Sequence, residues 1–371
     1  MKGSVRKRGE KWSYYFNVKI DGVYKKKEKG GFRTKKEAET ALREVLQQYE
    51  KQGFVQNNIN YTLQEYTQYW YDTIAIHYLK YNSLKLYERA IRLYIVPELG
   101  FIKLTAITPL TLQKFFAEKQ KTLSNSSVNA IKNVLNNTFK LAIKQNILLV
   151  NPMKQIELKN KPATRTVTSL NDDELKIIFN AIPDTHFYIP CMIGLHTGAR
   201  CGEILALTWD DINFESNTVT FNKSLLYKGK EGVEISTTKT ISSVRTIKMT
   251  NTLVNALLEW KKKQECNKDF YGEQYYQEQN FVCTHEDGCP INPPHFSTQI
   301  ARLSKKINVP FNFHQLRHTH ATKLIESDVN IKVIQERLGH HSIATTLSVY
   351  SHVTRNLEDE AINKFESNLN I

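Results

Sequence analysis

The stretch GLHTGARCGEILALTWDDI, residues 194–212, decides how the C-terminal part of this chain folds. It places Arg200 on a turn directly before a helix. Glu203 follows three residues later, so its carboxylate can share a face with Arg200 and hold the guanidinium in a charge-assisted pair. Trp209 is expected to pack in the core. The stretch therefore predicts a turn–helix unit that presents one fixed arginine.

A second stretch, FHQLRHTHATKL (313–324), holds three of the chain's 11 histidines within seven residues. On a helix, His314 and Arg317 are three residues apart and share one face. His318 is expected to support that face, and His320 is expected to point into solvent. The histidine count leaves a metal site open as an alternative interpretation.

Two more segments add chemistry. A β-rich region spans 218–249 and contains TTKTISSVRTI (237–247), and RLGHHSIATTLSVYSH (337–352) supplies His340 and Tyr350. His341 follows His340 directly, so either of the two could be the histidine that belongs to the site. The sequence lacks a phosphate-binding GxxxxGK[ST] loop, an HExxH motif and an acidic cluster of the two-metal kind. Neither nucleotide hydrolysis nor metal-assisted phosphodiester cleavage has a visible site.

Cations around a tyrosine suit attack on a phosphodiester. Planar guanidinium groups match phosphate geometry and neutralise charge that builds on its oxygens. A tyrosine with a pKa of about 10 is almost fully protonated at pH 7. Neighbouring positive charges favour its phenolate, which is the nucleophilic form.

The N-terminal residues carry most of the net charge of +14. Residues 1–36 hold 13 Lys and Arg against three acids, interleaved with aromatics, which favours a nucleic acid partner. KWSYYFNVKIDGVYKKKEKGGF reads as a hairpin turning at Asp21-Gly22, and a capping box of Thr34 and Glu37 opens a helix behind it. The candidate DNA-binding residues on the free sheet face are Arg6, Lys7, Arg8, Tyr14, Lys25, Lys26 and Lys27.

The rest of the chain divides by its pattern. We expect a linker at 54–60, a helical bundle and a second linker at 151–166. The bundle helices are expected near 62–74, near 83–95, from Thr108 and Pro109 onward, and near 127–144. The helix near 83–95 is expected to stop at Pro97. The five cysteines lack a CxxC pair, so reduced thiols are expected, although CTHEDGC (283–289) with His295 is an alternative zinc site.

The ordered set of motifs resembles the tyrosine recombinases, specifically phage and conjugative-transposon integrases. The matching motifs are TGARxxE (197–203), TTKTISSVRTI (237–247), HxLRH (314–318), LGH (338–340) and TTLSVYSH (345–352). The resemblance implies an α+β multidomain chain. It would comprise an arm-binding domain with a three-stranded sheet and a helix (1–56), a helical SAM-like core-binding domain (57–153) and a mostly α catalytic domain with a small sheet (165–371), which has the DNA breaking-rejoining enzyme fold.

Carried over by position, the resemblance implies a role for each motif residue. Arg200 and Arg317 would clamp the scissile phosphate, with Glu203 orienting Arg200. Tyr350 would be the nucleophile and Lys239 would protonate the leaving 5′-oxygen. His314 would assist proton transfer, His340 would hydrogen-bond the phosphate, and His318 would support them.

These roles describe a site-specific DNA recombinase that integrates, and can excise, a mobile element without metal, ATP or another cofactor. The alternatives are a type IB topoisomerase, a catalytically inactive DNA-binding regulator and a metal-dependent nuclease. Expected partners are core and arm-type attachment sites in double-stranded DNA, a homotetramer on that DNA, an excisionase and a DNA-bending host protein. The basic first residues precede no apolar segment, so we expect no secretory signal and a cytoplasmic location in a bacterial cell.

Overall fold

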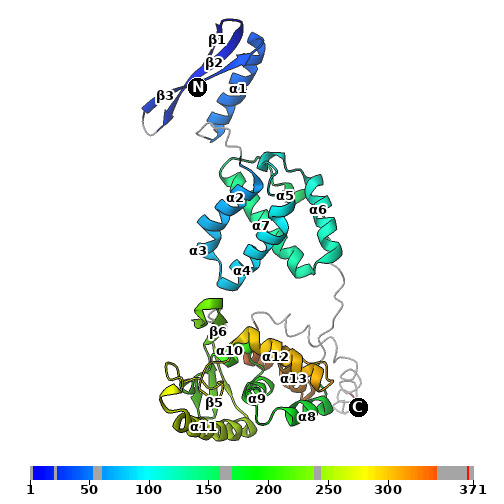
Figure 1. Ribbon diagram of the computed structural model, residues 1–371. Helices are drawn as coiled ribbons and strands as arrows, with labels where there is room; N and C mark the ends of the chain where they lie inside the picture. Colours follow the sequence, from blue (N-terminus) through cyan, green and yellow to red (C-terminus); the bar gives the residue numbers. More distant parts are fainter. Residues whose placement is uncertain are drawn as a thin grey trace. The chain divides into compact units, whose positions relative to one another are not determined.

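The computed structural model describes residues 3–20, 23–52, 61–158, 169–237, 244–340 and 366. The chain divides into two compact units, Met1–Pro162 and Ala163–Ile371. The α+β class is confirmed, because small sheets accompany helices in both units (Figure 1). None of the described helices combines the length and apolar character needed to cross a lipid bilayer.

The first unit begins with a three-stranded antiparallel sheet and one helix (Figure 1). Its elements are β1 (Gly3–Arg8), β2 (Lys11–Ile20), β3 (Val23–Phe32) and α1 (Lys35–Gln52). The hairpin prediction is confirmed by the pairing of Ile20 with Val23, while the turn residues 21–22 lie outside the described part. Thr34 caps α1 by accepting the Glu37 amide at 3.2 Å, as predicted.

Strand alternation corrects the prediction for Tyr14. Successive strand residues point to opposite faces, and Tyr14 and Phe16 point toward α1, where they pack with Leu42. Tyr14 is only 5% exposed, so its ring cannot lie on a DNA-contacting surface. Tyr15, which we did not single out, occupies the outer face.

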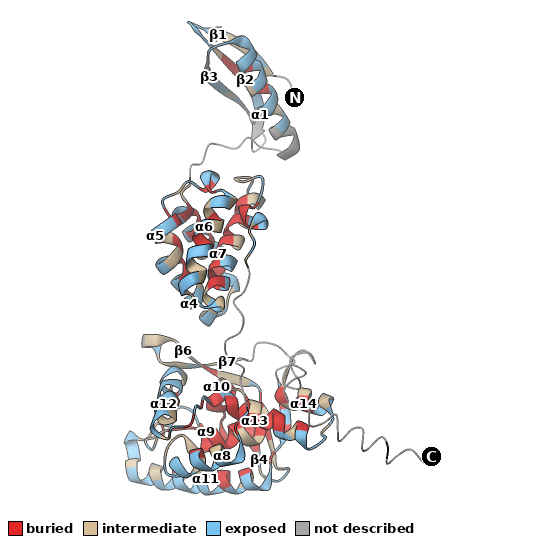
Figure 2. Ribbon diagram, turned by 90° about the vertical axis from the view of Figure 1, so that its right-hand side faces the viewer, coloured by how far each residue is buried: buried red, intermediate tan, exposed pale blue. Residues whose placement is uncertain are grey.

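The rest of the first unit is a helical bundle with a core of its own, centred on the long helix α7 (Figure 2). Thr62 and Glu65 form the predicted capping box, with the Glu65 amide 3.3 Å from Thr62 Oγ1. The elements are α2 (Leu63–Trp70), η1 (Tyr71–Ala75), α3 (Ile76–Tyr78), α4 (Tyr81–Ala90), η2 (Ile91–Ile95), α5 (Val96–Leu99), η3 (Leu104–Ala106), α6 (Pro109–Thr122), α7 (Asn125–Lys144) and η4 (Pro152–Gln155).

Two predictions about this bundle are wrong. The chain stays helical through Pro97, because the π-helical turn η2 ends at Ile95 and Pro97 falls in the first turn of α5, where a missing N–H costs little. The predicted linker at 151–166 is wrong for residues 151–158, while residues 159–166 lie outside the described part. Met153 is buried in the bundle, and Gln113 Nε2 donates to the Glu157 carbonyl at 3.1 Å. The linker at 54–60 lies outside the described residues, and the boundaries of the three domains stay a prediction.

The second unit surrounds the helices α9 and α13, which pack on each other and are buried along much of their length (Figure 2). Its helical elements are α8 (Asp172–Ala181), α9 (Tyr188–Thr197), α10 (Cys201–Leu205), η5 (Trp209–Asp211), η6 (Gly229–Glu231), α11 (Asn251–Tyr271), η8 (Gly272–Gln274), α12 (Pro293–Lys306), α13 (Phe313–Glu326) and α14 (Ile331–Leu338). The strands are β4 (Ile212–Asn213), β5 (Thr218–Phe221), β6 (Lys223–Tyr227), β7 (Val233–Thr237) and β8 (Arg245–Lys248), in sheets β4-β5-β8 and β6-β7. Trp209 is buried, as predicted.

The bundle core gives a direct stability test. Phe139 on α7 is fully buried, so Phe139→Ala is expected to cost about 3–5 kcal/mol of the free energy of unfolding. Phe101 is 74% exposed, and Phe101→Ala should change that free energy by less than about 0.5 kcal/mol. Hydrogen exchange of the α7 amides under native conditions measures both. Equal protection in the two variants would contradict the assigned core.

Candidate active site

Arg200 stands where the sequence predicted, at the turn between α9 and α10. Gly198 ends α9 in the left-handed conformation (φ 66°), and Arg200 caps α10. Arg200 Nη1 donates to Glu203 Oε1 at 2.7 Å, and the Arg200 amide donates to Glu203 Oε2 at 3.0 Å. The carboxylate therefore fixes both the backbone and the guanidinium of Arg200, while 43% of the Arg200 side chain stays exposed.

Glu203 also holds a second arginine, which the sequence analysis did not single out. Arg245, the first residue of β8, donates from Nη2 to Glu203 Oε2 at 2.8 Å, and both side chains are buried. Burial alone would raise the pKa of Glu203, but Arg245 and Arg200 outweigh it and hold the pKa below its ordinary value. Glu203 is therefore an anion shared between two guanidinium groups.

Arg317 on α13 is buried but keeps its charge. Its Nη1 donates to the Gly198 carbonyl at 2.6 Å and its Nη2 donates to the Leu338 carbonyl at 2.8 Å. Burial, followed by the charges of Arg200 and Arg245, lowers the pKa of Arg317 to about 9. The group is still cationic at pH 7.

The three arginines meet at the C-terminal end of α14. Consecutive carbonyls of residues 337, 338 and 339 accept from Arg245 Nε at 2.8 Å, Arg317 Nη2 at 2.8 Å and Arg200 Nη2 at 3.2 Å. The last carbonyls of a helix have no partners within it and carry partial negative charge. One helix end thus collects Arg200 and Arg317 from separate elements.

His320 corrects the expectation of a solvent-facing side chain. It is buried, with Nδ1 2.8 Å from the Leu195 carbonyl, and its Nε2 accepts from Arg337 Nε at 3.0 Å. Arg337 Nη2 also donates to the His196 carbonyl at 2.9 Å. The reason lies in α13, where positions 313, 316, 317 and 320 form one buried stripe. The hydrogen bonds of His320 and Arg337 thus connect α9, α13 and α14.

The remaining predicted histidines lie beside Arg317. The rings of His314 and His318 meet edge to face with centroids 4.8 Å apart. His314 keeps an exposed face, but partial burial and the charges of His318, Arg317 and Arg200 lower its pKa to about 4. Burial, Arg317 and Arg200 also lower the pKa of His340 to about 4. Both imidazoles are therefore neutral at pH 7.

The described part of the site carries an excess of positive charge. Arg200 and Arg245 pair with one buried carboxylate, Glu203, and the charges of Arg317 and Arg337 lie close enough to Arg245 to interact with it. Burial lowers the pKa values of Arg317, His314 and His340, and the neighbouring cations lower them further, so an anion that enters should raise them. Lys239, His341 and Tyr350 lie outside the described residues.

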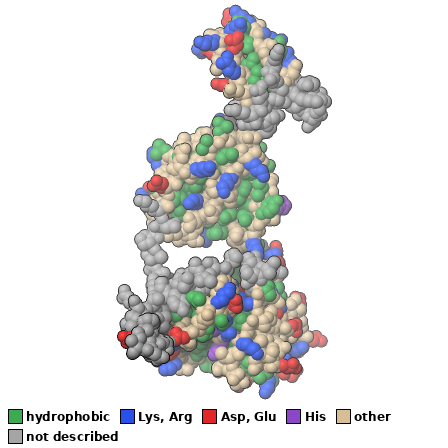
Figure 3. All heavy atoms as spheres, turned by 180° about the vertical axis from the view of Figure 1, so that it is seen from behind, with side chains coloured by type: hydrophobic (Ala, Val, Ile, Leu, Met, Phe, Trp, Pro, Cys, Tyr) green, Lys and Arg blue, Asp and Glu red, His purple; other side chains and the backbone are tan. Residues whose placement is uncertain are grey.

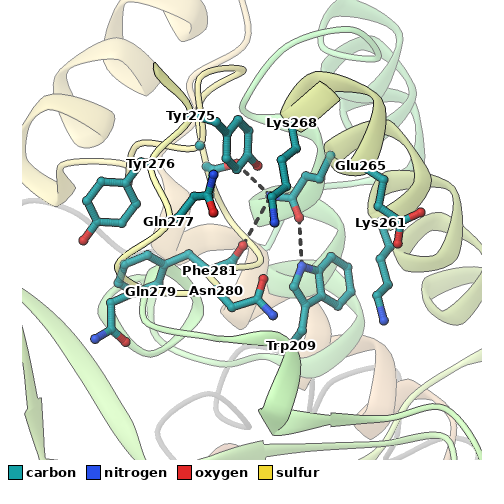
Figure 4. Close-up of a pocket in the computed structure, with 13 residues that line it drawn as sticks. Trp209, Lys261, Glu265, Lys268, Tyr275, Tyr276, Gln277, Gln279, Asn280 and Phe281 are labelled. Atoms are coloured by element: carbon teal, nitrogen blue, oxygen red, sulfur yellow. Dashed lines mark hydrogen bonds between the residues drawn. The ribbon is translucent and has the colours of Figure 1, made fainter. Parts of the chain in front are cut away.

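A hollow elsewhere in this unit has a different character. It has a volume of about 390 Å³ and lies between α11 and the segment after it, lined by Trp209, Tyr275, Tyr276 and Phe281 among others (Figure 4). Its polar floor is already paired: Gln264 accepts from Trp209 Nε1 at 2.8 Å and donates to Thr284 Oγ1 at 2.7 Å. Among the described residues, His, Cys, Asp and Glu form no group of three or more that could hold a metal ion.

In the N-terminal segment, the outer sheet face gathers only part of the predicted basic set. By register, Arg6, Arg8 and Lys26 alternate onto the face of Tyr15, whereas Lys7 and Lys27 alternate onto the other face. Lys26 Nζ lies 4.2 Å from the centre of the Tyr15 ring. Figure 3 shows blue Lys and Arg side chains gathered on this segment. The side chain of Lys25 lies outside the described part.

The chain matches three family profiles. The phage integrase family matches residues 168–356, an arm DNA-binding domain matches residues 4–54, and the N-terminal SAM-like domain of phage integrases matches residues 62–120. These ranges follow the order of the small sheet, the helical bundle and the second unit.

Similar curated proteins cover much of the chain. A tyrosine recombinase XerC-like protein of Caldanaerobacter subterraneus is 28% identical over 357 residues, which is 89% of each chain. The ICEBs1 integrase of Bacillus subtilis is 31% identical over 248 residues, which is 66% of each chain. Both are similar to this chain across more than its second unit.

Similar solved structures share the fold. The Tn1549 transposon integrase in complex with transposon right end DNA has a TM-score of 0.70 at 24% identity, covering 83% of this chain and 99% of that one. A lambda integrase tetramer bound to a Holliday junction has a TM-score of 0.57 at 18% identity, covering 93% and 96%.

The buried His320 predicts a pH dependence of stability. Burial and Arg337 lower its folded pKa from 6.5 to about 4. Above pH 6.5 the His320 ring is neutral in both the folded and the unfolded chain, so its burial has no pH-dependent cost. As the pH falls toward 4, His320 binds a proton in the unfolded chain but stays neutral in the folded chain. The free energy of unfolding therefore decreases by about 2–3 kcal/mol.

His320→Gln isolates this contribution, because a neutral side chain does not titrate. The variant should be less stable at pH 7, but its stability should fall less between pH 7 and 4.5 than that of the unaltered protein. Hydrogen exchange of α9 and α13 amides reports this unit. An equal pH slope in both proteins would show that His320 is not buried as a neutral group.

Proposed function

The chain belongs to the phage integrase family and is a tyrosine-type site-specific DNA recombinase, and we propose that it cuts and rejoins DNA through a 3′-phosphotyrosyl ester at Tyr350. The observation that carries this proposal is the placement of Arg200 and Arg317 on adjacent carbonyls of one helix end. Two guanidinium groups held side by side suit the two non-bridging oxygens of one phosphate.

The proposed step balances without a co-reactant. The Tyr350 oxygen attacks phosphorus, its proton passes to His314, and the bond from phosphorus to the 5′-oxygen breaks. Lys239 donates a proton to that oxygen. Arg200, Arg317 and His340 stabilise the charge on the non-bridging oxygens, a contribution of about 3–4 kcal/mol for each fixed donor in comparable sites. A 5′-hydroxyl of another strand reverses the step.

The neutral imidazole of His314 supports its part as proton acceptor. At pH 7 its pKa of about 4 leaves the ring unprotonated, and an arriving phosphodiester would raise that pKa toward a useful range. Because the ester conserves the bond energy, rejoining needs neither ATP nor a metal ion. Metal and ATP independence is therefore part of the proposal.

We also propose the partners of each region. The outer sheet face would contact arm-type DNA sites, and the bundle with the second unit would contact the core site, as a homotetramer on DNA. An excisionase and a DNA-bending host protein would set direction, in the cytoplasm of a bacterial cell. A type IB topoisomerase would have no need for a separate arm-binding sheet, and an inactive regulator would have no need for the arginine cluster.

The nucleophile can be tested with a nicked suicide substrate that carries the element's crossover site. The unaltered protein should become covalently joined to DNA. Tyr350→Phe should bind the same DNA with unchanged affinity and form no adduct, because the phenolic oxygen is the attacking atom.

The same assay tests metal independence. Adduct formation should persist in EDTA, whereas a metal-dependent nuclease would lose cleavage. Adduct formation by Tyr350→Phe would show that another residue attacks the phosphate. Full loss in EDTA would contradict the proposed chemistry.

The outer sheet face predicts a charge-matched comparison. The double variant Arg8→Gln, Lys26→Gln removes two cations from that face, and Lys35→Gln, Lys36→Gln removes two from α1. The first pair should weaken arm-site binding and lower the slope of log affinity against log salt by about two, because fewer counterions are released.

Fluorescence anisotropy at several salt concentrations measures this slope. The α1 pair should change arm-site affinity little, and neither pair should alter core-site binding. Equal losses for both pairs would contradict the outer sheet face as the arm-site surface.

A further inference from the structure

Arg245 is a buried cation held on several sides by its neighbours. It is 9% exposed, and its guanidinium carbon lies 4.8 Å from the centre of the Phe221 ring on the neighbouring strand β5. Its Nη2 reaches Glu203 and its Nε reaches the carbonyl of residue 337. Three elements, α10, α14 and β5, thus fix one guanidinium group.

These contacts connect Arg245 to the exposed Arg200 through Glu203, which both arginines bind. Glu203 binds Arg245 through Oε2 and Arg200 through Oε1, so the carboxylate cannot rotate without breaking one of the two pairs. Arg245 also lies six residues after Lys239, at the point where the chain enters β8. With only 7% of its side chain exposed, Arg245 is too buried to contact DNA itself.

We propose that Arg245 is a positioning residue for DNA cleavage that acts through Glu203 to orient Arg200, while its bond to the carbonyl of residue 337 holds Arg245 itself in place. This inference rests on the proposed function of Arg200. The planar fork of arginine meets both partners at once, whereas the single ammonium of a lysine could meet only the carboxylate.

Gly339 fits the same arrangement. It has a left-handed backbone (φ 65°), and a Cβ atom there would lie 3.1 Å from Arg245 Nη1 and 3.3 Å from its Cδ. Position 339 must therefore stay small for Arg245 to lie flat beneath the helix end. The LGH motif contributes this close packing as well as His340.

The test compares single-turnover cleavage of the suicide substrate by Arg245→Gln and Arg245→Lys. The Gln variant should cleave about 10- to 100-fold more slowly with unchanged DNA affinity, by analogy with the loss of partners that orient metal ligands. The Lys variant should recover part of the rate because it restores the charge beside Glu203. The control is Gln264→Met, which removes buried hydrogen bonds to Trp209 and Thr284 in the same unit. None of these bonds involves the arginine cluster, so the control should cleave at the rate of the unaltered protein.

A double-mutant cycle with Glu203→Gln separates positioning from a general structural role. If Arg245 acts through Glu203, the double variant should cleave no more slowly than the slower single variant. If the Gln variant is too slow to measure, the cycle is run with Arg245→Lys. Multiplied losses, a rate for Arg245→Gln equal to that of the unaltered protein, or a parallel loss of DNA binding would overturn the inference.

The two proposals fail in different ways. If the unaltered protein forms no adduct, the proposed function fails. If it forms the adduct normally and Arg245→Gln does so at the same rate, only the role of Arg245 fails.

Discussion

The described part of the proposed active site depends on the C-terminal end of α14, where three consecutive carbonyls each accept a hydrogen bond from a guanidinium group. Bringing Arg245, Arg317 and Arg200 together is opposed by their mutual repulsion. The partial negative charge of a helix end, about half an elementary charge, offsets part of that repulsion, and Glu203 offsets more. The remaining positive charge is what an entering phosphate would neutralise.

Packing around Gly198 holds this helix end in place. A Cβ atom at Gly198 would lie 2.6 Å from Leu338 Cδ2 and 2.7 Å from His320 Cδ2, and the residue has a left-handed backbone. Glycine is required there by both conditions. In the same turn the Gly198 carbonyl accepts a hydrogen bond from Arg317. The TGAR motif therefore supplies Arg200 and also positions Arg317 through its backbone.

Local sequence rules predicted much of this architecture. The hairpin, the capping boxes at Thr34 and Thr62, and the pairing of Arg200 with Glu203 all depend on residues close in sequence. The motif order also identified the family. What the sequence could not reveal depends on tertiary contacts.

Arg245 lies within the TTKTISSVRTI motif, but only the fold brings β8 to α14. His320 seemed solvent-facing because it was compared with His314, although the stripe through positions 313, 316 and 317 contained the needed signal. Tyr14 and Tyr15 could not be assigned to faces until α1 showed which side of the sheet it covers. The π-helical turn that admits Pro97 has no pattern that we recognised.

The central claim is that one helix end presents Arg200 and Arg317 to the same phosphate. The most direct measurement is an experimental structure of the Tyr350→Phe protein on core-site DNA. We predict that both guanidinium groups hydrogen-bond one phosphate while they keep the carbonyls of residues 339 and 338, and that Arg245 stays on Glu203. A scissile phosphate bound away from either arginine would contradict this account.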